Sequence, residues 1–263
     1  MKHTQIQILC LLLATLLTAC VKKPSGSVSL HLEHAPKRAL ALFELTPENG
    51  AVFIDSLRPD RKGNYRFSFP DDSLRLYILA NAKDRLCVLS APGKKLHLQA
   101  DYYSLSASAF WDLGKDSLCP NVVFLRYQQN LQKAEEAIQH ITDLWMEHRY
   151  RTTHPDSLHA VCSARIDSIA ETIKQEAVRI SFAHTGTLIP VFVFNKTLGQ
   201  RSVFDASTPQ DLLFMLECAT EMEQKNPQNP HVRRLRYNLS RIESFRKQEA
   251  LRQMEKSGKT VTN

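Results

Sequence analysis

Cysteine is the residue type in this chain with the widest chemical scope, because a thiolate can act as a nucleophile, a redox group or a metal ligand. The 263 residues include six cysteines, and no two of them stand in a C-x-x-C arrangement. This spacing predicts neither a redox dithiol nor a zinc knuckle. We interpret the cysteines after residue 20 as small buried hydrophobes, and disulfide formation stays open because four cysteines allow three pairings. They are Cys87, Cys119, Cys162 and Cys218.

Cys20 differs from the other cysteines because it directly follows an apolar run. The run from Ile6 to Leu17 comes after a short start with Lys2, and it is shorter than the roughly 20 apolar residues that a transmembrane helix needs. This length is typical of an export signal. The ending "LTAC" resembles the bacterial lipobox, in which the cysteine receives a diacylglycerol and the peptidase cuts before it. The alternatives are an ordinary cleaved signal with an incidental cysteine, or a buried apolar segment.

The lipobox resemblance implies a division of the N-terminal region into a lipoprotein signal peptide (1–19) and a lipidated tether (20–26). Two or more acyl chains, such as palmitate, hold a protein stably at a membrane. The tether is polar and contains Pro and Gly, so we expect it to be flexible. Val21 stands where an aspartate tends to retain lipoproteins at the inner membrane. We therefore expect an envelope protein attached to the outer membrane through lipid on Cys20 and facing the periplasm.

Four histidines near residue 150 raise the question of a metal site. They are His140, His148, His154 and His159, and Glu147 lies among them in the sequence. No two of these histidines are four residues apart, which is the spacing that presents two ligands on one helix face. We therefore predict solvated surface histidines and no metal site.

Motifs of the common catalytic and cofactor sites are missing from the sequence. It contains no G-x-S-x-G, no phosphate-binding glycine loop and no H-E-x-x-H, and it has only eight glycines. We predict no catalytic residue and no cofactor. Trp111 and Trp145, with Tyr102 and Tyr103, are candidates for a ligand-binding aromatic patch, but packing at the junction of two subdomains is the default interpretation.

The chain is basic, with a formal net charge of +7 and a pI of about 9.1. In the sequence the basic residues are scattered, and the dense group is Arg233, Arg234 and Arg236. An exported protein seldom meets DNA, so we predict no nucleic-acid partner and interpret the basic group as a solvated helix face.

Alternating apolar and polar residues predict an antiparallel β domain over residues 27–110. Turn-forming segments rich in Pro, Gly, Asn and Asp separate the strands and favour successive hairpins. The regular spacing is typical of a small β-sandwich or an open barrel. The predicted strands span residues 27–33, 39–45, 51–57, 64–69, 74–79, 85–89 and 95–99.

A change to helical periodicity predicts a helical domain over residues 118–256, and thus an α+β fold class. The first two helices are expected to pack antiparallel as a hairpin. Thr208 and Pro209 are a good helix start, a cap followed by proline. The last residues, 257–263, are expected to form a disordered tail. The predicted helices span residues 122–149, 158–180, 187–198, 212–224 and 230–256.

This order of elements resembles a family of lipoproteins from Bacteroidetes-type bacteria. In that family a lipobox precedes a small β domain of unknown function, a helical region and a thioredoxin-like thiol-disulfide oxidoreductase domain. The resemblance covers most of residues 27–250 and rests on 51–69, 96–108, 180–198 and the loop and charged helix from Asn226 onward. The family's catalytic domain needs a C-x-x-C, which this sequence lacks, so no catalytic dithiol is carried over and only the preceding module is expected.

Two functional classes follow from these observations. The first is a non-catalytic envelope lipoprotein that acts as a binding or assembly module for a periplasmic or outer-membrane partner protein. The second is an accessory or degenerate subunit of a thioredoxin-like oxidoreductase system, which would present substrate to a separate catalytic protein. The absence of a dithiol favours the first class.

Overall fold

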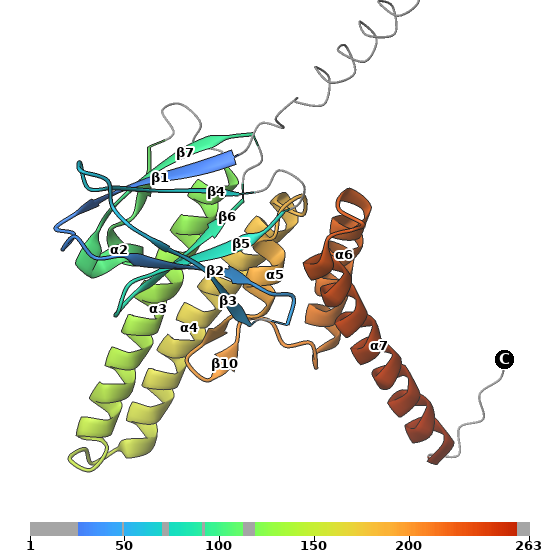
Figure 1. Ribbon diagram of the computed structural model, residues 1–263. Coiled ribbons are helices and arrows are strands. Elements are labelled where there is room, and N and C mark those ends of the chain that lie inside the picture. The colour runs from blue at the N-terminus through green and yellow to red at the C-terminus, as the bar shows by residue number, and fades with distance from the viewer. Residues whose placement is uncertain (1–25, 49, 70–73, 91–92, 113–118, 257–263) are drawn as a thin grey trace, which may run out of the picture.

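The computed structural model describes residues 26–48, 50–69, 74–90, 93–112 and 119–256. Two β-sheets built from the N-terminal part of the chain are followed by helices, so the α+β fold class is confirmed (Figure 1). The predicted signal peptide, Cys20, most of the tether and the predicted tail lie outside the described residues.

Each sheet has four strands and is open, which makes the β domain a sandwich and not a closed barrel. The first sheet, called sheet A, has the order β4 (Asn64–Phe69), β1 (Gly26–Glu33), β7 (Lys95–Asp101) and β8 (Phe110–Trp111). The second, called sheet B, has the order β3 (Ala51–Leu57), β2 (Leu40–Leu45), β5 (Leu76–Ala80) and β6 (Arg85–Leu89).

The connectivity corrects the prediction of successive antiparallel hairpins. Three pairs of consecutive strands are neighbours in the sandwich, namely β2–β3, β5–β6 and β7–β8, and in the last pair η1 and α2 stand in place of a hairpin turn. Strand β1 lies parallel to β7, from Ser27 opposite Lys95 to Glu33 opposite Asp101. The other connections pass from one sheet to the other. A short turn-rich segment can close a hairpin or cross between sheets, so local turn chemistry did not distinguish the two cases.

The sandwich core forms because alternate side chains of each strand point between the sheets. On β1 these are Val28, Leu30 and Leu32, none more than 4 % exposed. Phe67 of β4 meets Tyr77 of β5 across the two sheets, with ring centroids 5.7 Å apart. Inward-facing residues of both sheets therefore share one apolar cluster.

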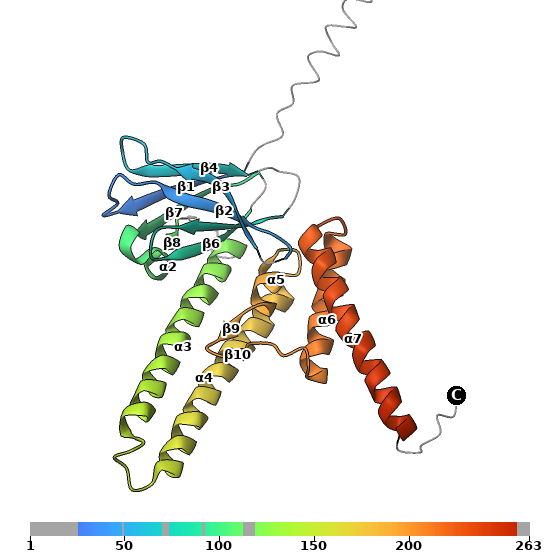
Figure 2. The same cartoon turned by 60° about the horizontal axis from the view of Figure 1, so that its bottom comes forward.

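Five longer helices follow the sandwich, and proline stands in the first turn of several of them, where its missing N–H is not needed. The first two form an antiparallel hairpin that extends away from the sheets (Figure 2). The predicted central helix over 187–198 is shorter than expected, because the chain turns after Phe194 into the small strand β9. The helices are α3 (Pro120–His148), α4 (Pro155–Ala183), α5 (Ile189–Phe194), α6 (Pro209–Lys225) and α7 (Pro230–Lys256).

Short elements were not predicted from the sequence, because they carry too few residues to show a period. They are the 3₁₀ turn η1 (Tyr102–Ser104), α2 (Leu105–Ser108), β8, β9 (Thr197–Leu198) and β10 (Arg201–Ser202).

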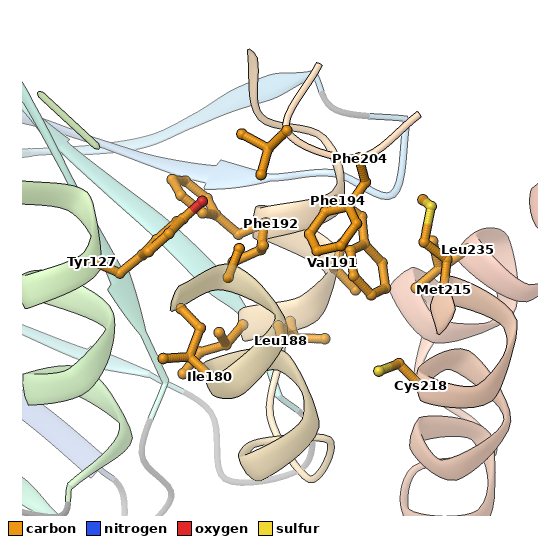
Figure 3. Packing of buried hydrophobic residues seen from close by; sticks show 14 of the residues in the cluster. Tyr127, Ile180, Leu188, Val191, Phe192, Phe194, Phe204, Met215, Cys218 and Leu235 are labelled. Carbon is orange, nitrogen blue, oxygen red and sulfur yellow. The ribbon is translucent and has the colours of Figure 1, made fainter. Parts of the chain in front are cut away.

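A second apolar cluster joins the helices to sheet B. Leu76 of β5 and Leu89 of β6 point away from the sandwich and pack among residues of α3, α4 and α5. Figure 3 shows labelled side chains of α3, α4, α6 and α7 gathered around α5, whose six residues are all buried. Phe124 of α3 and Phe192 of α5 pack edge to face with centroids 4.7 Å apart. Around β5 and β6, sheet B is therefore the middle layer between sheet A and the helices.

Two amide side chains of α3 bind the backbone of β6 at the edge of sheet B. Asn121 accepts from the Leu89 N–H at 2.9 Å and donates to the Leu89 carbonyl at 3.0 Å. Gln128 makes the same pair of bonds to Cys87, both at 3.1 Å. No strand of the described residues pairs with the outer edge of β6. The two amides bind its backbone there instead, and they fix α3 against the sheet.

We predict that Asn121→Ala destabilises the fold by about 1–3 kcal/mol, because it leaves the buried N–H and C=O of Leu89 without partners. The free energy of unfolding from urea titration measures the effect. Gln139→Ala is the matched control: this glutamine is exposed on the same helix and bonds to Asp143 one turn away, so its loss should change stability by less than about 0.5 kcal/mol. Equal effects of the two substitutions would contradict the role of Asn121.

Candidate functional site

The four described cysteines are all free thiols on separate elements. Burial raises the pKa of Cys87 on β6 to about 11 and that of Cys218 on α6 to about 12. Cys218 lies in the helical core and points among apolar side chains (Figure 3). A high pKa keeps a thiol protonated and unreactive at neutral pH, so these two cysteines behave as small apolar residues.

Cys119 lies in the setting closest to that of a reactive thiol. It is the N-cap residue of α3, at the positive end of the helix dipole, and it is 2 % exposed. It borders a cavity of about 200 Å³ at the junction of sheet B and the helices, which Leu89 and Leu188 also line. No other described cysteine lines this cavity, so the site lacks the resolving partner that rapid disulfide exchange requires.

The candidate histidines do not converge on a metal site. His140, His148, His154 and His159 are exposed, and the described part of the chain holds no group of three His, Cys, Asp or Glu side chains placed to bind a metal ion. The His159 ring instead packs edge to face on Trp145, with centroids 5.6 Å apart.

The four candidate aromatic residues do not form one patch. Tyr102 is buried and Trp111 packs against the same sandwich core. Tyr103 touches Tyr102, at 5.4 Å between centroids, but is 63 % exposed. Trp145 lies far along α3, where the guanidinium of Arg149 stacks on it. Core packing, the default interpretation, therefore accounts for Tyr102 and Trp111.

A feature that the sequence reasoning missed is the exposed edge strand β3. Its consecutive apolar residues Val52, Phe53 and Ile54 are 51 %, 56 % and 48 % exposed, and only Leu57 at the end of the strand is buried. None of the three belongs to an apolar core cluster. The signal was present as an apolar triplet inside a strand, since a strand with one face in the core should alternate.

A β-bulge explains why β3 leaves the core. The register with β2 shifts between Leu42, opposite Asp55, and Phe43, opposite Phe53, so that Ile54 is the extra residue. A bulge bends the strand and re-aims its side chains. Phe53 then rests edge to face on Phe43, at 5.8 Å between centroids, instead of entering the sandwich. The bulge thus leaves the side chains of Val52, Phe53 and Ile54 exposed to solvent.

The two edges of sheet B differ in their hydrogen bonding. At β6 the amides of Asn121 and Gln128 bind the edge backbone. At β3, no strand among the described residues pairs with the outer edge. Its only charged residue, Asp55, is weak protection by comparison with the lysines and prolines that usually block strand addition. An apolar and unblocked edge of this kind is suited to an extended segment of another chain.

Comparisons with protein-family models, with curated proteins and with solved structures found no match for this chain. Among the helices of the described residues, none combines the length and the apolar character needed to cross a bilayer. The function therefore has to be argued from the geometry above.

We predict that the fragment Lys22–Asn263 does not accelerate insulin reduction above background, because the thiols are dispersed and the pKa values of two of them are strongly raised. Turbidity at pH 7 with dithiothreitol measures the rate. Cys119→Ala is the decisive comparison, since Cys119 is the described cysteine that stands at a helix N-terminus and borders the cavity. Turnover that vanishes in this variant would make Cys119 a catalytic residue.

Proposed function

We propose that this protein is a non-catalytic binding or assembly module of the cell envelope, anchored to the outer membrane through lipid on Cys20 and docking a partner protein by strand addition to β3. The observation that carries the docking proposal is the apolar outer edge of β3, with which no described strand pairs and where Val52, Phe53 and Ile54 are each about half exposed. The anchor rests on the lipobox-like "LTAC" ending at Cys20.

Strand addition fits β3 better than a flat apolar contact. The added segment would receive backbone hydrogen bonds along the seven residues of β3, which supply affinity with little dependence on sequence. The apolar side chains of β3 would supply contact on both faces of the new strand. The opposite edge of sheet B is occupied by α3 amides, so β3 is the edge at which the sheet can grow.

The anchor is tested by Cys20→Ser, because serine offers no thiol for a thioether. We expect the wild-type protein to stay in the membrane fraction after a high-salt wash and the variant to be released from it. Membrane retention of Cys20→Ser after the same wash would show that acylation at Cys20 is not the attachment.

The docking edge is tested by Val52→Lys/Ile54→Lys. Two lysines on an edge strand disfavour strand addition, so we expect at least a ten-fold loss of partner recovery when tagged protein is crosslinked and purified from membrane extracts. Both side chains lie outside the core clusters, so the melting temperature should change little.

Phe182→Lys is the matched control, because Phe182 on α4 is 60 % exposed and also apolar. With this control, the amount of partner recovered should equal that recovered with the wild-type protein. Undiminished recovery with the β3 variant, or equal loss with the control, would contradict docking at β3. A thiol-disulfide oxidoreductase as the captured partner would assign the protein as an accessory of that system.

A further inference from the structure

Basic side chains surround a shallow depression at one end of the β-sandwich. Lys37, Arg58 and Arg61 line it, and the single acidic residue in its lining is Asp60. The depression has a volume of about 620 Å³. All three basic residues are exposed, and this end of the sandwich therefore presents concentrated positive charge.

The fold assembles this cluster from segments that are separate in the sequence. Lys37 lies between β1 and β2, and Arg58 and Arg61 lie between β3 and β4. The two connections meet because β1 and β4 pair antiparallel, with His31 opposite Asn64 at this end. This is why the sequence showed only scattered basic residues.

The one carboxylate at the site is already used by the turn that carries it. Asp60 accepts hydrogen bonds from the backbone N–H of Lys62 at 2.7 Å and of Asn64 at 2.9 Å. These bonds hold the pKa of Asp60 below its usual value, and the bond from the Asn64 N–H has the largest effect. Among the described residues, Lys37, Arg58 and Arg61 form no ion pair. The cluster is therefore free to attract anions.

The distance between the basic cluster and the start of β1 determines which surface the cluster can reach. Gly26 lies opposite Phe69, at the other end of the same two strands. The strand β1 has eight residues and rises about 3.3 Å per residue, so Gly26 and the cluster are roughly 26 Å apart. The helical hairpin α3–α4 projects from the side of sheet B, and sheet A forms the outer layer (Figure 2). The sandwich can thus lie along a surface while the hairpin extends away from it.

We propose that the cluster of Lys37, Arg58 and Arg61 binds the phosphate groups of anionic lipids at the membrane surface. The inference rests on the membrane attachment proposed above, and it adds an electrostatic contact that orients the anchored sandwich. Each Lys or Arg close to an anionic bilayer contributes roughly a five-fold increase in partitioning. Three such residues together account for about a 100-fold preference for anionic over neutral bilayers.

Vesicle sedimentation tests this binding without the lipid anchor. Both core clusters consist of residues after Gly26, so the fragment Lys22–Asn263 keeps the described fold and lacks Cys20. We expect it to bind phosphatidylcholine vesicles that contain phosphatidylglycerol, to release them at high salt, and to ignore pure phosphatidylcholine. Lys37→Glu/Arg58→Glu/Arg61→Glu should lower the partition coefficient at least about 100-fold.

The control Arg233→Glu/Arg234→Glu/Arg252→Glu makes the same change in net charge on exposed residues of α7 and should keep binding. Equal loss with the control would reduce the effect to net charge and overturn the site. Wild-type binding by the cluster variant, or binding to free inorganic phosphate or heparin but not to vesicles, would also overturn it. Because the fragment carries no Cys20, none of these outcomes depends on whether Cys20 is acylated.

Discussion

Backbone N–H and C=O groups at the edges of a sheet need partners, and the way this need is met in sheet B organises the molecule. At β6 the amides of Asn121 and Gln128 take the place of a neighbouring strand. The same bonds hold α3 against the sheet, and α3 in turn supports α4 and the buried helix α5 through the shared apolar cluster. At β3 no such capping exists among the described residues. The need of edge backbone groups for hydrogen-bond partners is thus met by α3 at β6, and at β3 it leaves an edge that another chain can pair with.

Most elements of the fold could be predicted because their alternating or helical pattern of apolar residues extends over enough consecutive residues to be recognised. The seven strands and the long helices are read from local alternation and from proline at helix starts, which are properties of consecutive residues. The strand pairing could not be predicted in this way. The segment before Asn64 has the composition of a hairpin turn, yet it leads from β3 in one sheet to β4 in the other, a difference decided by burial of Tyr65, Phe67 and Phe69 between the sheets.

The candidate sites likewise divide into those set by the local sequence and those set by long-range strand pairing. The interpretation of the cysteines as buried residues is confirmed for Cys119 and Cys218, whereas Cys87 and Cys162 are only partly buried. The exposure of Val52, Phe53 and Ile54 depends on a bulge, which no residue type specifies alone. The basic cluster depends on the antiparallel pairing of β1 with β4, which brings Lys37 to Arg58. Features that depend on long-range pairing become visible only in the structure.

Hydrogen exchange of the β3 backbone tests the central claim, that β3 is the open edge of sheet B, most directly. In the isolated protein, the outer amides of residues 51–56 should exchange rapidly, whereas the amides of Cys87 and Leu89, bound by α3 side chains, should be protected. In the complex recovered from membranes, the β3 amides should become protected as well. Slow exchange of β3 in the isolated protein, or unchanged exchange in the complex, would contradict the account.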